Sequence, residues 1–227
     1  MEDKKKIILI VFAFFVVMIA IFLKAKKVEE NKTDGEKFKE EYECLNEDHL
    51  SVSISKGNPI VYAEIEEIFD LLENKTGVIY FGFPECPWCR NAVPVLLEVA
   101  KEEGIDKVYY YNGYEDRDIL SLDENNQIIT KKEGTENYTK LLQLLDEHLS
   151  YYEVSNGEVT VTSSEKRLYF PTIVFVKEGK IKLVHVSTVE SQTDPSIPLN
   201  EEQTEELKDI FRNGFSLLSD TCKKDKC

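Results

Sequence analysis

Two cysteines stand three positions apart where an apolar, strand-like run meets the start of a predicted helix. Cys86 and Cys89 enclose Pro87 and Trp88. With Cys86 as N-cap, Pro87 takes the first helical position, where its missing N–H group costs nothing and its fixed φ is already helical. Unpaired backbone N–H groups and the helix dipole then stabilise the Cys86 thiolate and lower its pKa. The sequence therefore predicts that Cys86 is a nucleophile at neutral pH.

Cys89 follows one helical turn later, beneath Cys86. From there it can attack a mixed disulfide formed at Cys86 and release the partner, which is two-step thiol–disulfide exchange. The dithiol carries the two electrons itself, so no cofactor is expected. Two other interpretations stay open, a half zinc site and a pair of inert cysteines. No metal site is predicted, because His49, His148 and His185 are too scattered to complete one.

The strand, the CxxC segment and the helix together resemble the thioredoxin superfamily. Pro94 stands five residues after Cys89, where thioredoxins carry a proline that kinks this helix. Downstream, Phe170 and Pro171 precede the apolar run Ile173 to Val176, which resembles the family's cis-proline followed by a hairpin. Taken alone, Pro171 is an ordinary proline at the start of a strand. The resemblance implies a cis bond between Phe170 and Pro171, and contacts from both residues to an extended substrate.

The segment from Gly82 to Cys89 is most similar to thioredoxin-like proteins grouped with the bacteriocin transport accessory proteins of Gram-positive bacteria. The resemblance implies an α/β fold with a central mixed sheet flanked by helices. It also implies a thiol–disulfide oxidoreductase that acts on cysteine-containing proteins or peptides. The alternative is a redox-inactive binding or assembly module that assists peptide export. A third interpretation is metal delivery through the CxxC.

Three residues near the cysteines are candidate pKa modulators. Tyr80 stands where thioredoxins keep a buried carboxylate, so the proton route of the resolving thiol must differ, through water or Glu85. A nearby Glu85 raises the pKa of the Cys86 thiol by like-charge repulsion, whereas Arg90 lowers it. Solvated surface charges are the other interpretation of Glu85 and Arg90. Trp88 is expected to shape access to Cys86.

An unbroken apolar run from Ile7 to Leu23 predicts a membrane segment. As a helix it measures roughly 26 Å, near the hydrocarbon thickness of a bilayer once flanking lysines snorkel. The run is longer than the apolar region of a cleavable signal peptide, and Lys24 to Lys27 offers no small-residue cleavage site. We therefore expect an uncleaved single-pass anchor.

Lysines flank this run on both sides, so the positive-inside count is tied. We expect the N-terminus inside and the domain outside, because the resembling proteins act outside and a disulfide-forming centre persists there. A membrane or extracytoplasmic redox partner fits that place. The net charge of −15 at pH 7 excludes nucleic acid as a partner.

The chain divides into an anchor (residues 1–27), a charged stalk (28–41) and a thioredoxin-like domain (42–227) with an insertion over about residues 113–166. Alternating apolar and polar residues predict a strand at Ser51 to Ser55. Helices are expected from just after Pro59 through Leu72, from Cys86 to Glu103 and after Asn200. Further strands are expected at Val78 to Phe83, Lys107 to Tyr111, Ile173 to Val176 and Ile181 to Val186.

Inside the insertion, a leucine pattern predicts a helix from about Thr135, and Asn156-Gly157 is typical of a hairpin turn. Tyr109 to Tyr111 and Tyr151-Tyr152 either line a substrate groove or pack within strands.

The three remaining cysteines are Cys44, Cys222 and Cys227. Their odd number leaves one thiol over, and a bridge between Cys222 and Cys227, or from Cys44 to either, is expected to be structural.

Overall fold

The computed structural model describes residues 14–19, 22 and 32–219. Its centre is a five-stranded mixed sheet with the strand order β1-β3-β2-β8-β9. Strands β1, β3 and β2 run parallel, and β8 and β9 join them antiparallel. The strands span Ile60–Tyr62 (β1), Val108–Tyr111 (β3), Gly77–Phe81 (β2), Thr172–Lys177 (β8) and Lys180–Val186 (β9).

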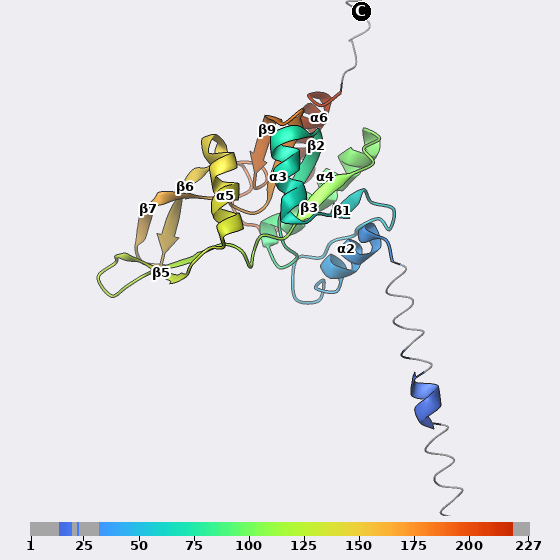
Figure 1. The fold of residues 1–227 in the computed structure, drawn as a ribbon, viewed down its shortest axis with the longest axis horizontal. Coiled ribbons are helices and arrows are strands. Elements are labelled where there is room, and N and C mark those ends of the chain that lie inside the picture. Colours follow the sequence, from blue (N-terminus) through green and yellow to red (C-terminus); the bar gives the residue numbers. More distant parts are fainter. Residues whose placement is uncertain (1–13, 20–21, 23–31, 220–227) are drawn as a thin grey trace, which may run out of the picture.

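Helices cover both faces of this sheet (Figure 1). Successive side chains of β2 point to opposite faces, as in any strand. Tyr80 packs with residues of α2 (Asp34–Glu43), α4 (Pro87–Glu102) and α6 (Glu201–Ser216). Phe81 packs with residues of α3 (Ile65–Asn74) and α5 (Glu136–Leu145). The chain is therefore an α/β protein with a two-sided core, as expected from its sequence.

Most predicted elements of this core are confirmed. Strands β2, β3, β8 and β9 lie where the apolar runs place them, and Asn200 caps α6 through a hydrogen bond with Gln203. The strand expected at Ser51 to Ser55 is wrong, since this segment is not a strand and pairs with none among the described residues. Val52 and Ile54 are buried, but their N–H groups donate to the side chains of Asn46 and Glu43. The first strand is instead β1, directly after Pro59, where the sequence predicted a helix.

Helix α2 corrects the second half of the stalk expected over residues 28–41. Thr33 and Glu36 form a capping box, in which each side chain bonds the other residue's backbone N–H group. Phe38 and Tyr42, one turn apart, are 0% exposed in the core. Most residues of this helix are charged, so the average composition of the segment indicated a stalk although two aromatic residues lie on one face. Residues 28–31 of the expected stalk lie outside the described residues.

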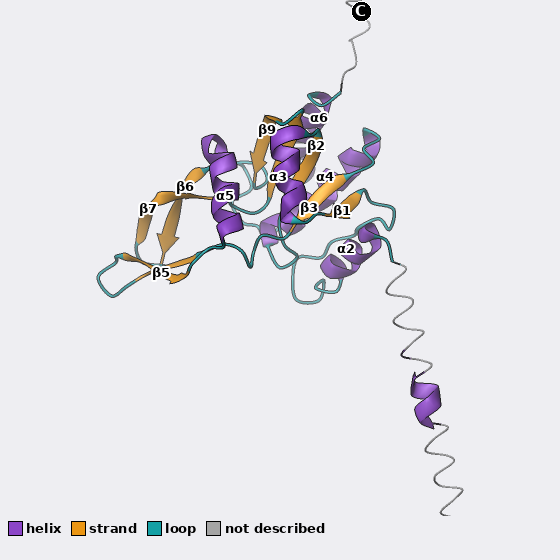
Figure 2. Cartoon of the chain, in the orientation of Figure 1, coloured by secondary structure: helices purple, strands orange, loops and turns teal. Residues whose placement is uncertain are grey.

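The insertion contains more regular structure than the sequence indicated. Helix α5, capped by Thr135, and the hairpin of β6 and β7 at Asn156-Gly157 are confirmed. A second hairpin, β4 with β5, was not predicted, although Asp123 and Asn126 in its turn are residues that favour turns. Figure 2 shows both hairpins beside α5, away from the central sheet. The strands span Ile119–Leu122 (β4), Ile128–Lys132 (β5), Ser150–Ser155 (β6) and Thr160–Arg167 (β7), and a short 3₁₀ turn covers Asp146–His148.

The expected anchor, Ile7 to Leu23, lies largely outside the described residues. Residues 14–19 and 22 of it are described, and they are helical. Within the described ranges, none of the helices combines the length and the apolar character that crossing a bilayer requires.

Candidate active site at the cysteine pair

The cysteine pair lies at the junction of β2 and α4, as predicted. Cys86 is the N-cap of α4, Pro87 is the first helical residue, and the Cys86 Sγ accepts the N–H group of Cys89 at 3.2 Å. This bond satisfies one of the donors that a helix start leaves unpaired. It also places the sulfur where the helix dipole favours negative charge.

The two thiols differ in their environments. The hydrogen bond from the Cys89 thiol and the backbone N–H groups of Cys89 and Trp88 lower the pKa of Cys86, although burial opposes them. Burial, followed by the hydrogen bond to Cys86, raises the pKa of Cys89 well above its usual value. Cys86 therefore ionises first, while Cys89 keeps its proton. This is the asymmetry that an attacking and a resolving cysteine require.

Cys86 is less accessible than a freely reachable nucleophile. It is 5% exposed and Cys89 is 0% exposed, and both belong to the core cluster on the α3 side of the sheet. Phe83 and Trp88 pack against the same cluster and are only partly buried.

The segment before β8 lies against the pair. The peptide bond between Phe170 and Pro171 is cis, as predicted. The Cys86 thiol donates to the carbonyl oxygen of Phe170 at 3.5 Å. On the other side of this segment, the carbonyl of Pro171 accepts the N–H group of Ser187 in a 2.8 Å hydrogen bond. The structure thus brings both members of the predicted substrate-contact site to the CxxC.

Tyr80 lies next to Cys89, on the side of the pair away from solvent. Its hydroxyl lowers the pKa of the Cys89 thiol, against the larger effect of burial. The Tyr80 hydroxyl also bonds the Tyr42 hydroxyl at 2.7 Å. Burial raises the pKa of both tyrosines, so both are neutral at physiological pH. The sequence indicated Tyr80 but not Tyr42, because Tyr42 belongs to the helix taken for a stalk.

Gly82 is required by this packing. A Cβ atom at Gly82 would lie 2.2 Å from the Tyr80 hydroxyl. Any side chain there would displace either the tyrosine or the loop that leads to Cys86.

Arg90 corrects one predicted role. Its side chain is 1% exposed, so it is not a solvated surface charge, and it is not among the main influences on the Cys86 pKa. The guanidinium donates to the carbonyl oxygens of Leu50, Tyr42 and Pro84 and to the Asn46 side chain. Arg90 therefore ties α4 to α2 and to the loop after α2. Burial lowers its pKa.

Arg117 is the cation that bears on Cys86, and the sequence analysis did not identify it. Its positive charge is among the influences that lower the Cys86 pKa. Arg117 comes from the insertion, and no local spacing links it to the CxxC. Glu85 is exposed beside the pair.

Of the other cysteines, Cys44 is described. It is exposed and unbridged, and its thiol donates to the Glu41 carbonyl at 3.2 Å. Cys222 and Cys227 lie outside the described residues, so their pairing stays a prediction. Residues 14–19, 22 and 32–219 contain no cluster of three histidine, cysteine or carboxylate side chains able to hold a metal ion.

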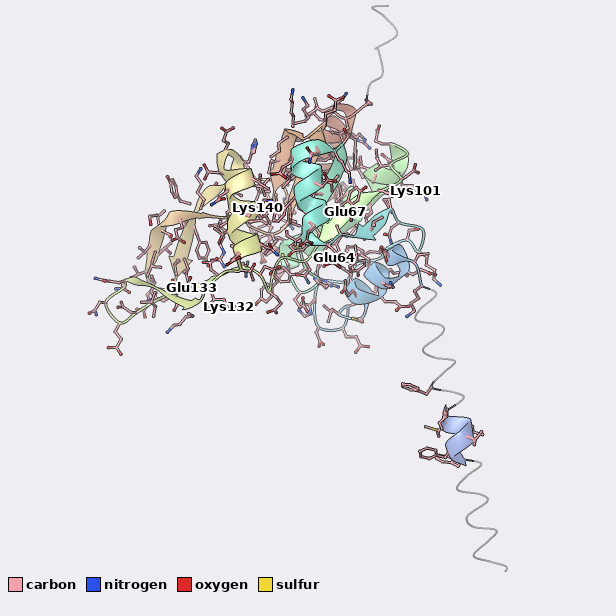
Figure 3. All side chains as sticks on the ribbon, in the orientation of Figure 1. Glu64, Glu67, Lys101, Lys132, Glu133 and Lys140 are labelled. Carbon is pink, nitrogen blue, oxygen red and sulfur yellow. The ribbon has the colours of Figure 1, made fainter. Side chains whose placement is uncertain are left out.

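The predicted tyrosine groups divide between packing and a cavity. Tyr110 is buried in the core and stacks on Tyr80 with ring centroids 5.4 Å apart. Tyr151 and Tyr152 instead line a cavity of about 830 Å³ in the insertion. Glu133, which directly follows β5 and is labelled in Figure 3, belongs to the same wall. The cavity also contains Arg167, whose guanidinium lies 3.9 Å from the centre of the Tyr152 ring.

No protein-family model matches this chain, and no curated protein is significantly similar to it.

Proposed function

We propose that this chain is a thioredoxin-like thiol–disulfide oxidoreductase that acts on cysteine-containing proteins or peptides. The observation that carries the proposal is the position of Cys86, which caps α4 and lies against the Phe170 carbonyl before a cis-proline. The strand order and the parallel and antiparallel pairings are those expected of a thioredoxin-like sheet. The opposite pKa shifts of the two thiols also support it.

The reaction needs only the dithiol and a disulfide in the partner. The Cys86 thiolate attacks one partner sulfur, a mixed disulfide forms, and the other partner sulfur leaves as a thiolate that takes a proton from solvent. Cys89 then loses its proton and attacks the Cys86 sulfur, which closes the Cys86–Cys89 disulfide and releases the second partner thiol. The partner gains two electrons and the pair loses two. The reverse exchange oxidises a partner dithiol, and the reduction potential of the pair sets which direction dominates.

Insulin reduction by the full-length protein in detergent tests this proposal, with dithiothreitol as electron donor. We expect activity in the wild type, its loss in Cys86→Ser, and trapped mixed disulfide in Cys89→Ser. Cys44→Ser is the matched control, because this cysteine is exposed and is not part of the CxxC segment. Equal activity in wild type and Cys86→Ser would refute the enzymatic role.

The 5% exposure of Cys86 favours one alternative, a redox-inactive module that binds peptides during export. In that module, Cys86 and Cys89 would form only a static disulfide bridge. It predicts normal peptide binding in Cys86→Ser and no insulin reduction by the wild type. The reduction potential of the Cys86–Cys89 pair separates the two roles further, since a static bridge resists reduction by the glutathione pool.

We also propose that residues 7–23 anchor the protein in the cell membrane, with the N-terminus inside and the domain outside. The apolar run in the sequence supports this placement. Cys44 is a suitable reporter because it is exposed. A membrane-impermeant thiol reagent should label it in intact cells, and labelling only after lysis would reverse the orientation.

A further inference from the structure

Arg117 is held by aromatic rings close to the cysteine pair. Its guanidinium carbon lies 4.8 Å from the ring centroid of Tyr114, 5.4 Å from that of Phe170 and 6.0 Å from that of Phe83. At such distances a ring quadrupole attracts a cation. In the part of the chain that the structure describes, no hydrogen bond or ion pair engages this guanidinium. The three rings therefore define its position.

Two of the residues that carry these rings also belong to the surroundings of Cys86. The carbonyl of Phe170 accepts from the Cys86 thiol at 3.5 Å. Phe83 meets Phe170 edge to face with centroids 5.5 Å apart, and it packs against the cluster that contains Cys86. Phe83 and Phe170 are thus common to the rings around the cation and to the packing of the core cluster that contains Cys86.

We propose that Arg117 is a positioning residue that stabilises the thiolate of Cys86, and that Phe83, Tyr114 and Phe170 hold it in place for this purpose. The proposal rests on the thiol–disulfide exchange proposed above. It gives the insertion a part in the chemistry, because Arg117 lies between β3 and β4 and not in the CxxC segment. In a chain of net charge −15, one cation beside the nucleophile offsets a surrounding field that disfavours a thiolate.

The other titratable groups around the pair do not replace this cation. Cys89 faces Cys86 from α4, and burial raises its pKa. Tyr80 from β2, Tyr42 from α2 and Tyr110 from β3 lie on the Cys89 side, and burial raises the pKa of each. Glu85, next to Cys86 in sequence, is exposed and negatively charged. Arg117 is thus the cation among the strongest influences on Cys86.

The test is the pH dependence of Cys86 alkylation by iodoacetamide in the full-length protein, followed by mass spectrometry of the peptide that carries Cys86. We expect Arg117→Gln to raise the midpoint by roughly half to one pH unit, since a nearby opposite charge shifts a pKa by about this much or more. Below the midpoint, this leaves about threefold to tenfold less thiolate. Arg117→Lys should retain most of the wild-type midpoint.

Lys140→Gln is the matched control. Lys140 lies on α5 (Figure 3), and its Nζ atom is 4.1 Å from the centre of the Phe69 ring. Like Arg117→Gln, this variant removes a cation that lies over an aromatic ring. Its midpoint should equal that of the wild type. An unchanged midpoint in Arg117→Gln, or an equal shift in Lys140→Gln, would overturn the proposal.

If circular dichroism shows that Arg117→Gln is not folded, the alkylation midpoint of Tyr114→Leu tests the proposal instead. This substitution removes one ring and no charge at a side chain that is 42% exposed. A raised midpoint supports the proposal and an unchanged one overturns it. Alkylation does not require catalytic turnover, so the two proposals can fail separately. If the wild type does not reduce insulin but Arg117→Gln still shifts the Cys86 midpoint, the enzymatic role is refuted and the role of Arg117 is supported.

Discussion

The hydroxyl oxygens of Tyr42 and Tyr80 lie 2.7 Å apart, next to the buried thiol of Cys89. Tyr42 comes from the first described helix of the domain and Tyr80 from its central strand. Together they form a neutral polar pair, and Tyr80 stands at the position where thioredoxins keep a buried carboxylate. In the exchange proposed above, the Tyr80 hydroxyl is expected to stabilise the Cys89 thiolate that attacks in the second step.

Tyr80→Phe should slow release of the partner from the mixed disulfide. The substitution removes the hydroxyl that lowers the pKa of Cys89, so Cys89 ionises less readily. We expect the second step to slow roughly threefold and the free energy of unfolding to fall by about 1 kcal/mol. Quenched-flow trapping of the mixed disulfide measures the rate.

Tyr110→Phe is the control for this change. The Tyr110 ring stacks on Tyr80, but its buried hydroxyl has no hydrogen-bond partner among the residues described. Its loss should leave both the rate and the stability close to wild type. Equal rates in Tyr80→Phe and Tyr110→Phe would contradict the role of Tyr80.

The two cysteines should differ in the pH dependence of their alkylation. The pKa of Cys86 is lowered, so its thiolate forms below the pH at which a free cysteine ionises, about 8.5. The pKa of Cys89 is raised, so its reactivity should appear only at higher pH. Mass spectrometry after timed alkylation across a pH series gives both midpoints. A lower midpoint for Cys89 than for Cys86 would reverse the assigned roles.

Arg90→Met should destabilise the fold and leave the Cys86 midpoint nearly unchanged. Three carbonyl groups and one amide oxygen lose their donor, and we expect a loss of about 3 kcal/mol or more. Urea unfolding measures this loss. Arg212→Gln, which breaks exposed ion pairs with Glu102 and Asp209, should cost less than about 1 kcal/mol. A raised Cys86 midpoint with wild-type stability in Arg90→Met would restore Arg90 as a pKa modulator.

Gly82→Ala should destabilise the junction between β2 and α4. The added methyl group would overlap the Tyr80 hydroxyl, at a cost of about 1 to 3 kcal/mol. Gly57→Ala is the comparison, because a Cβ there meets no atom within 4 Å and alanine restricts the unfolded chain. Thermal unfolding should show a lower midpoint in the first variant and an unchanged or higher one in the second.

Phe38→Ala tests whether α2 belongs to the domain. The side chain is fully buried, and its truncation should lower the free energy of unfolding by about 3 to 5 kcal/mol. Lys37→Ala, on the exposed side of the same helix, should change it by less than about 0.5 kcal/mol. If Phe38→Ala and Lys37→Ala have equal free energies of unfolding in denaturant titration, α2 is not part of the folded domain.

Features that depend on neighbours within about one helical turn were predictable from the sequence. The capping position of Cys86, the first-turn place of Pro87 and the cap at Asn200 each follow from the local backbone geometry that those residues favour. The Asn156-Gly157 turn is of the same kind. The apolar runs of β2 and β8 predicted central strands because both of their faces are covered. The cis bond before Pro171 was predicted by resemblance.

Only the tertiary structure decided which side chains surround the sulfurs. Arg90 looked like a solvated charge, yet it is buried because carbonyls of distant segments satisfy its donors. Arg117 and Tyr42 reach the site from segments that carry no signal for it. At Ser51 to Ser55 the apolar alternation is present, but side chains of Asn46 and Glu43 take the place of a neighbouring strand. The physical reason is common to all four: local pattern reports what a residue favours, whereas its partners are set by contacts between parts of the chain far apart in sequence.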